Sequence, residues 1–307
     1  MFAIVRKELA DYVTSIRFIA SFFLVIVVSV TGLMAASQGI RSANLPEGIV
    51  FLGLFTTSGT VIPSLTYLVS LLIPIIGIAL GFDAINSERA GGTLSRVLAQ
   101  PVFRDSVING KFLAGVVTLS IMVGTMLLLI AGYGLSMIGV PPTPEEIIRL
   151  FGYFVMTIIY GAFWMGLAIL FSIVFRRVAA SLLFSLALWM FFSIFILLIA
   201  PGIANVLVPT ADGAQAELIR NAELQRMITR VSPNILFQEA TTVLLVPLVR
   251  SLGMVSQSQA AYMVPNPLSL GQSILLVWPH ITSLISLSAV CFAVSYILFM
   301  RQEIRAT

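Results

Sequence analysis

Six long apolar runs constrain this chain more than any other feature of its sequence. Each run is about 20 residues or longer, the length that an α-helix needs to cross the hydrocarbon layer of a bilayer. They are too long to be the short alternating strands of a membrane β-barrel, so helices are expected. The expected spans are residues 18–36, 61–82, 112–140, 150–175, 178–200 and 274–300.

The composition agrees with a chain whose solvent is lipid. Only 10% of the 307 residues are charged and 59% are apolar, whereas soluble domains carry about 25% charged residues. Most of the surface therefore cannot face water. The sequence predicts an all-α polytopic membrane protein with a single transmembrane domain over residues 1–307.

The positions of the basic residues predict which side of the membrane each loop occupies. Cytoplasmic loops carry an excess of Lys and Arg. Eleven of the 17 basic residues fall on one side of the predicted spans: Arg6, Lys7, Arg17, Arg89, Arg96, Arg104, Lys111, Arg176, Arg177, Arg301 and Arg305. Both termini and the loop 83–111 are thus predicted to be cytoplasmic, and residues 201–273 extracytoplasmic.

Two regions outside the spans are expected to be helical. Residues 1–17 have apolar side chains at helical spacing and charged ones on the other face, as in a helix lying in the headgroup plane; an extension of the first span is the alternative. The outer segment 201–273 contains a charged helix over Ala214–Val231. The following Asn234–Val249 is too short and polar for a span, so an interfacial or shallow re-entrant helix is expected.

The sequence lacks the residue sets that catalysis requires. His280 is the only histidine and Cys291 the only cysteine, which leaves no Ser/His or metal-binding combination. A phosphate-binding GxxxxGK[ST] loop is also missing. We therefore expect no enzyme activity, metal or cofactor in this chain. His280 is expected to be a capped or solvated residue near the outer boundary, with a proton-coupled site as the alternative.

The charge distribution argues against two further function classes. Basic residues gather at span ends rather than in aromatic-rich patches, so no nucleic-acid partner is expected. The predicted span interiors carry no acids or bases, whereas ion-coupled carriers usually keep such groups at mid-membrane. Any energy for transport is therefore expected to come from a partner.

The loop 83–111 is the only substantial cytoplasmic loop. Leu94, Val97 and Leu98 share one helical face. Thr93 can cap this short helix and Pro101 can end it. A short amphipathic helix between two spans can pass a displacement from a soluble partner to the membrane; a solvated connector is the alternative.

Several motifs in this loop resemble ABC transporter permeases of the type-2 exporter class. They are Ile85–Leu94, Leu98–Val102, Arg104 and Gly110–Lys111. The opening Arg6–Leu9 is similar to the amphipathic N-terminal helix of that family. The six-span layout and the outer segment also fit, although Ala90 stands where the family commonly has an acid.

The resemblance implies a permease subunit of an ATP-driven exporter, paired with a second, identical permease. Two copies of a separate ABC ATPase would bind ATP and Mg. The ATPase-coupling loop would comprise Asp83, Glu88, Arg89, Gly92, Thr93, Leu94, Arg96, Leu98, Pro101, Arg104 and Lys111, flanked by Arg6, Lys7 and Glu8 of the N-terminal helix. The location implied is the plasma (inner) membrane of a prokaryote.

Further expected partners are membrane lipid and an extracytoplasmic protein at residues 201–273. Two other functions stay open at this point. One is a non-transporting membrane anchor for an extracytoplasmic assembly, and the other is an ion-coupled secondary transporter.

Overall fold

The membrane-spanning part of the chain is a bundle of long helices. The computed structural model describes residues 2–42, 50–92, 103–139, 141–209, 215–249 and 267–301. Within these ranges six helical segments are long and apolar enough to cross a membrane. They are α2 (Ile16–Ser42), α4 (Leu65–Gly81), α7 (Arg104–Ile138), α8 (Pro144–Val174), the continuous α9–η1–α10 (Val178–Met190, Phe191–Phe195, Ile196–Leu207) and α14 (Leu270–Arg301). This confirms the predicted all-α, six-span fold.

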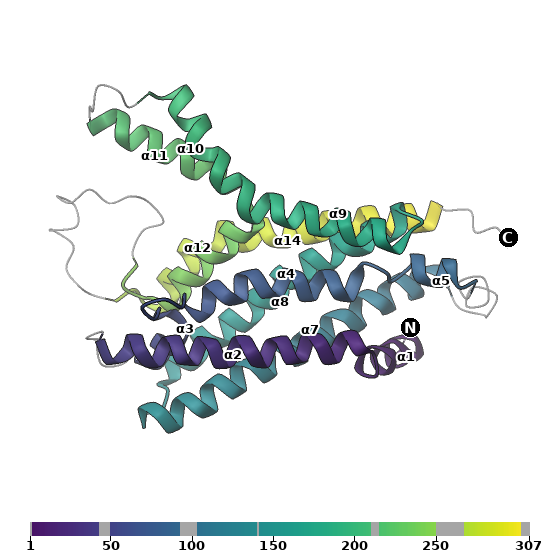
Figure 1. Cartoon of the computed structure of the whole chain (residues 1–307), viewed down its shortest axis with the longest axis horizontal. Coiled ribbons are helices and arrows are strands. Elements are labelled where there is room, and N and C mark those ends of the chain that lie inside the picture. The colour runs from purple at the N-terminus through teal and green to yellow at the C-terminus, as the bar shows by residue number, and fades with distance from the viewer. Residues whose placement is uncertain are drawn as a thin grey trace.

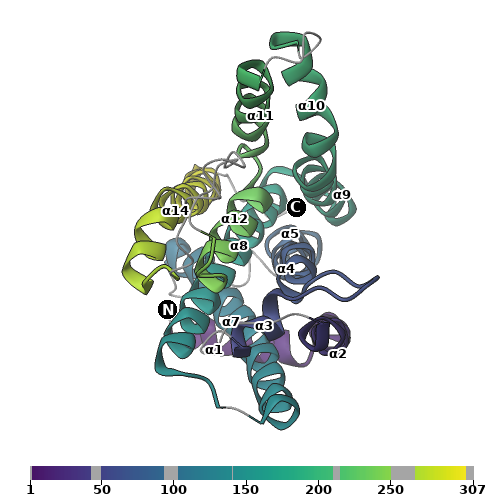
Figure 2. The ribbon, with the colours of Figure 1, turned by 90° about the vertical axis from the view of Figure 1, so that its left-hand side faces the viewer.

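The shorter helices lie at the two ends of the bundle. α1 (Phe2–Val13) and α5 (Asn86–Ala90) lie at the end that also holds Arg301 at the close of α14; we call it the terminal end. The opposite end carries α3 (Val50–Thr56), α11 (Gln215–Thr229) and α12 (Pro233–Leu245). α10 and α11 form a hairpin that stands away from the other helices (Figures 1 and 2).

Two spans reach well past the predicted bounds. α7 has 35 residues and starts at Arg104 rather than near 112, and α8 has 31 and starts at Pro144 rather than 150. At about 1.5 Å per residue both exceed the roughly 30 Å hydrocarbon layer. The hydropathy pattern located only the apolar part of each helix. The polar start of α8 is helical because the Thr143–Glu146 capping box supports it.

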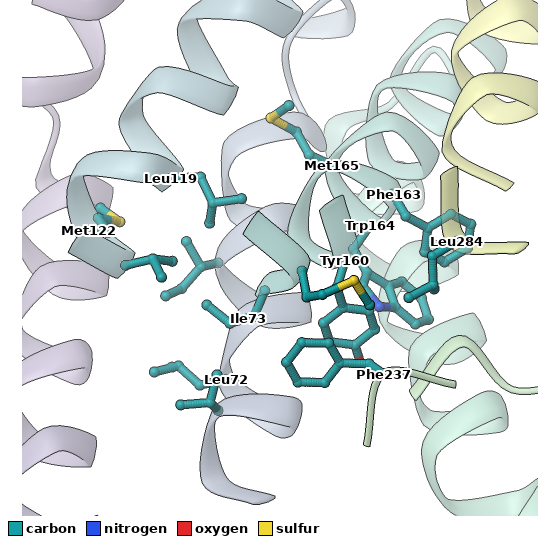
Figure 3. Close-up of a cluster of buried hydrophobic side chains, with 14 of the residues drawn as sticks. Leu72, Ile73, Leu119, Met122, Tyr160, Phe163, Trp164, Met165, Phe237 and Leu284 are labelled. Atoms are coloured by element: carbon teal, nitrogen blue, oxygen red, sulfur yellow. The ribbon is translucent and has the colours of Figure 1, made fainter. Parts of the chain in front are cut away.

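α8 forms the centre of the packing, against α4 on one side and α14 on another. Glycines allow the approach to α4: a Cβ at Gly77 would lie 2.7 Å from the Gly161 carbonyl oxygen, and one at Gly81 would lie 2.6 Å from that of Met165. The GxxxG pair of the sequence is therefore a seam within this chain. Figure 3 shows the adjoining apolar cluster, in which Tyr160 of α8 meets Phe237 of α12.

α12 packs inside the bundle, as the re-entrant alternative for residues 234–249 expects. The rings of Phe237 and Tyr160 stack with centroids 4.4 Å apart, and Tyr160 lies about 24 Å along α8 from Pro144. The Ser232 hydroxyl, just before α12, donates to the Phe192 carbonyl at 2.7 Å. Phe192 lies in the π-helical turn η1, where the regular i→i+4 bonding of the span is interrupted. α12 packs there because its buried apolar face and its start both find partners inside the bundle.

Candidate coupling site at the terminal end

The N-terminal helix is docked onto the protein rather than held by lipid alone. Val5 and Glu8 are buried, and Gly110 of α7 lets α1 approach, since a Cβ there would lie 2.8 Å from the Ile4 side chain. The Tyr12 hydroxyl donates to the Leu80 carbonyl at 3.0 Å. α1 therefore contacts both α7 and the end of α4.

The two faces of α1 differ from the simple amphipathic expectation. The inward face includes the acidic Glu8, which was expected on the charged face. Phe2 is 88% exposed, and Ile16, which begins α2, is 82% exposed. The helix also ends at Val13 instead of continuing to 17, because the chain turns where the Ser15 hydroxyl donates to the Tyr12 carbonyl. This break excludes a simple extension of the first span. Phe2 and Ile16 are left to meet lipid.

A buried lysine joins three helices. Lys111 Nζ of α7 lies 3.0 Å from Glu8 Oε1 of α1 and 2.7 Å from Glu88 Oε1 of α5. The three side chains are only 5%, 9% and 15% exposed, respectively. Because water screens such charges poorly, these contacts are stronger than surface ion pairs. We call Glu8, Glu88 and Lys111 the latch.

Lys7 extends the latch towards solvent. Its Nζ lies 3.1 Å from Glu8 Oε1 and 2.9 Å from Asp11 Oδ2. Burial lowers the pKa of Lys7, but the hydrogen bonds and negative charges of Asp11 and Glu8 outweigh this and raise it above its ordinary value. Lys7 therefore stays protonated at physiological pH.

Two further contacts fix the ends of α2 and α5. Arg17 forms an ion pair with Asp83, and its guanidinium lies 5.0 Å from the centre of the Phe82 ring. The Ser172 hydroxyl of α8 accepts hydrogen bonds from the backbone N–H groups of Ile85 and Asn86, at 2.9 and 3.1 Å. The turn between α4 and α5 is thus held from both sides.

A pocket of about 650 Å³ lies between α1 and the ends of α2, α4 and α7. Its wall includes the latch together with Lys7, Asp11, Arg17 and Asp83. Opposite charges interleave around it, so the site is not a uniformly basic or acidic surface. No group of three His, Cys, Asp or Glu side chains in the described part of the chain could hold a metal ion.

The structure brings together some of the predicted coupling residues. Glu88, Lys111, Lys7 and Glu8 meet in one cluster, with Asp83 at its edge. The side chains of Glu88 and Lys111 face inward, so they support the site from within the protein and do not form its exposed surface. Arg6 and Gly92 are exposed, Arg89 is half-buried, and Arg104 begins α7. The predicted residues Thr93, Leu94, Arg96, Leu98 and Pro101 lie outside the described residues.

Sequence reasoning missed Tyr12, Arg17 and Ser172 as parts of this site. Tyr12 follows the buried Glu8 by four residues, so the two share the docking face of α1; this spacing was the available signal. Nothing local in the sequence shows that Ser172, far along the chain, accepts from the turn after α4.

A second polar centre lies at the opposite end. The Arg149 side chain, 1% exposed, donates to the carbonyls of Leu244 and Leu268 at 2.8 and 2.6 Å. It also donates to Ser273 at 3.1 Å and forms an ion pair with Glu145 at 2.8 Å. This arginine ties the end of α12 and the start of α14 to α8.

These features define a multi-pass helical membrane protein whose N-terminal helix is ion-paired, through Lys111, to the segment that follows its second span. The sequence model of the ABC-2 family of transporter proteins matches residues 2–304, and the chain belongs to that family. The family resemblance of the loop and the N-terminus is thereby confirmed.

Two relatives are both named probable ABC transporter permease protein NosY. The one from Pseudomonas aeruginosa is 29% identical over 200 residues, which cover 62% of this chain and 66% of the relative. The one from Stutzerimonas stutzeri is 32% identical over 145 residues, which cover 44% and 48%. The chain thus spans less than two thirds of either relative. Both names agree with a permease, a membrane subunit that is not itself catalytic.

Proposed function

We propose that this chain is the membrane-spanning permease subunit of an ATP-driven ABC exporter in the plasma (inner) membrane of a prokaryote. Both termini lie in the cytoplasm. Two copies of a separate ABC ATPase bind ATP and Mg at the terminal end, and a second, identical permease completes the transporter. The membership in the ABC-2 family supports the ATPase partner, and the clustering of basic residues at the terminal end supports the orientation.

The latch is the observation that carries this proposal. Lys111 lies on α7, Glu88 follows α4, and Glu8 belongs to the helix that leads into α2. A displacement of the surface formed by α1 and α5 therefore reaches three spans at once. A coupling device needs this property, because the ATPase dimer delivers a rigid-body movement and the membrane helices must respond together.

The exposure of each side chain indicates whether it holds the helices of the site together or can contact the ATPase. Glu88 and Lys111 hold α1 and α5 together. Arg6, Arg89 and Gly92 are at least partly exposed on the surface that α1 and α5 form. We assign the ATPase contact to those three and to residues 93–101. Replacing Glu88 by lysine would place a second positive charge beside Lys111. This variant therefore tests the ion pairs of the latch rather than the contact with the ATPase.

Affinity purification in mild detergent, followed by identification of the accompanying proteins, tests the proposal. We expect an ABC ATPase in stoichiometric amount. Recovery of an extracytoplasmic protein alone would instead support the membrane-anchor function. The α10–α11 hairpin supplies a specific reason to look for such a protein as an additional partner, because Val206 and Met227 on it are 80% and 66% exposed.

A charge reversal at Arg6 distinguishes a loss of contact with the ATPase from a loss of folding. Arg6→Glu should weaken retention of the ATPase and lower its stimulation in the reconstituted complex, with normal yield and thermal stability of the permease. Arg220→Glu, on the exposed side of α11 at the opposite end, is the matched control. Equal retention of the ATPase by both variants would contradict the assigned contact.

A further inference from the structure

The pocket beside the latch has the size of a ligand site and an excess of acidic groups. Its volume of about 650 Å³ is within the range of small-molecule sites. Of the described residues on its wall, four carry a carboxylate and three a cation: Glu8, Asp11, Asp83, Glu88, Lys7, Arg17 and Lys111. Because the negative charges outnumber the positive ones, the wall disfavours a purely anionic ligand and favours one that carries a cation.

Three of these carboxylates have one oxygen left to accept a hydrogen bond. Glu8 uses only Oε1 for its two lysine contacts, and Asp11 and Asp83 each use only Oδ2 for one cation. Glu8 Oε2, Asp11 Oδ1 and Asp83 Oδ1 have no hydrogen-bond partner among the described residues. The first and the last keep accessible surface, and the Asp11 side chain is 59% exposed. These oxygens can therefore receive the N–H donors of a bound ammonium group.

Arg17 adds free donors next to these acceptors. One nitrogen, Nη1, donates to Asp83, whereas Nε and Nη2 have no hydrogen-bond partner in the described part of the chain. The Arg17 side chain is 49% exposed and lines the pocket. A guanidinium presents its N–H groups as a planar fork that fits a phosphate. The ion pair of Arg17 and Asp83 thus offers a place for an anion beside a place for a cation.

The pocket lies at the level of the lipid headgroups. Arg17 directly precedes the apolar run that begins at Phe18, and basic residues at the ends of spans lie at the membrane boundary. The apolar part of the wall includes Ile16 of α2 and Leu80 of α4. Ile16 is 82% exposed, so the pocket borders on the surface that faces the bilayer. A ligand with a charged headgroup and an apolar tail fits this arrangement.

The polar cluster at the opposite end differs because its histidine is enclosed. His280 of α14 is 4% exposed, and its Nε2 lies 2.8 Å from Glu239 Oε2 of α12. The other ring nitrogen, Nδ1, is buried as well. His280 is therefore capped by Glu239 rather than solvated, and its ring is not accessible to a ligand.

We propose that the pocket beside the latch binds the zwitterionic headgroup of an aminophospholipid, phosphatidylethanolamine, from the leaflet at the terminal end. The phosphate pairs with Arg17, and the ammonium donates to the free oxygens of Asp83 and Asp11. Only two carbons separate the phosphate from the ammonium in this headgroup, which fits the adjacent charges of Arg17 and Asp83. The acyl chains leave past Ile16. The inference does not depend on the ATPase or on the transported substrate.

Native mass spectrometry of the full chain, purified in mild detergent and titrated with single lipids, tests the proposal. We expect phosphatidylethanolamine to bind about tenfold more tightly than phosphatidylcholine or phosphatidylglycerol. The trimethylated ammonium of phosphatidylcholine has no N–H donor, and phosphatidylglycerol has no cation. Each comparison therefore removes at least one hydrogen bond to a charged group.

Variants of the pocket locate the binding. Asp83→Asn and Arg17→Gln should each weaken phosphatidylethanolamine by about tenfold. The matched controls are Asp105→Asn on α7 and Arg177→Gln just before α9, which make the same changes outside the pocket and should leave the affinity unchanged. Because Asp83→Asn can disturb the turn after α4, Asp11→Asn is measured beside it. The exposed Asp11 side chain can change without loss of the fold, so binding should fall while the unfolding temperature stays the same.

Four outcomes would overturn the proposal. The first is equal binding of the three lipids. The second is equal weakening by the pocket variants and their controls, which would indicate a general charge effect. The third is binding of soluble phosphoethanolamine as tightly as the lipid, which would indicate a solute site. The fourth is a loss of ATPase retention in Asp83→Asn with unchanged lipid binding, which would assign the pocket to a basic side chain of the ATPase.

Discussion

The two ends of the bundle are held together by different kinds of contact. At the terminal end Lys111 joins two carboxylates, Glu8 and Glu88, from neighbouring helices. At the opposite end Arg149 pairs with one carboxylate, Glu145, and also donates to Ser273 and to the backbone carbonyls of Leu244 and Leu268. A lysine is a point charge on a flexible stem, whereas a guanidinium is a planar fork that fits fixed acceptors. Because one guanidinium holds four partners in fixed directions, we expect the opposite end to be the more rigid of the two ends.

The opposite end has further support of the same fixed kind. Glu146 Oε1 accepts from the backbone N–H groups of Phe51 and Leu52 at 3.0 and 3.3 Å, and so receives the start of α3. Neighbouring residues on the first turns of α8 thus anchor α3, α12 and α14. A transporter needs such a frame if its spans are to pivot when the terminal end is displaced.

The largest effect is expected from breaking the rigid end. Arg149→Met removes the donors of two buried carbonyls, and we expect a destabilisation of about 3–5 kcal/mol, as for breaking a buried charged network. Thermal unfolding in detergent measures it. Arg149→Lys should recover only part of the loss because one ammonium cannot serve the same acceptors. If Arg149→Met unfolds at the wild-type temperature, the rigid-end account fails.

Breaking the latch should lower the free energy of unfolding by a smaller amount, and compensating substitutions should restore most of it. Lys111→Met removes the buried ammonium between Glu8 and Glu88 and leaves them only the more exposed Lys7 as a shared cation. We therefore expect a loss of about 1.5–3 kcal/mol, the range for hydrogen bonds to charged groups. Hydrogen exchange should rise in α1 and stay unchanged in α12.

Replacing both glutamates by the neutral amide glutamine provides the control for that variant. In Lys111→Met/Glu8→Gln/Glu88→Gln the repulsion between carboxylates is absent, and most of the lost stability should return. A triple variant no more stable than Lys111→Met would show that the cavity, rather than the charges, causes the effect.

A smaller, local change is expected at the turn between α4 and α5. Ser172→Ala leaves the N–H groups of Ile85 and Asn86 without their acceptor, at a cost of about 1–3 kcal/mol for a buried unsatisfied group. Hydrogen exchange at these two amides should accelerate, and Ser185→Ala, whose hydroxyl bonds within its own helix, is the control. Unchanged exchange at both amides would exclude the proposed role of Ser172.

The smallest effect is expected at the ion pair of Arg17 and Asp83, because the Arg17 side chain is 49% exposed. Surface ion pairs contribute about 0–1 kcal/mol, so Arg17→Gln should hardly change the unfolding temperature. Its contribution should also shrink with added salt, unlike that of Lys111. A loss as large as that of Lys111→Met would mean that the two sites are not distinguished by burial.

The parts of the fold that could be predicted are those that local sequence determines. Each span carries its own apolar run, and the loop motif around Glu88 and Lys111 is contiguous enough to indicate the family. The residues that contact each other across the bundle could not be predicted from the sequence. Arg149 lies just before the predicted span 150–175, and the sequence does not single it out because its acceptors Leu244 and Ser273 lie 95 and 124 positions away.

The same limit applies at Glu239 and Glu8. Glu239 made residues 234–249 look too polar for a span, and only the fold shows that Arg230 and His280 are its partners. Glu8 was placed on the exposed face of the N-terminal helix, since its partner Lys111 is 103 positions distant. Polar residues that pair across the bundle look like surface residues in a sequence.

Site-specific photocrosslinking tests the central claim that the α1–α5 surface receives the ATPase. A photoreactive phenylalanine at position 6, on the exposed side of α1, should crosslink to the ATPase in native membranes. The same group at position 206, on the exposed side of α10, should not. Crosslinking of the ATPase from position 206, with none from position 6, would contradict both the assigned contact and the orientation of the chain.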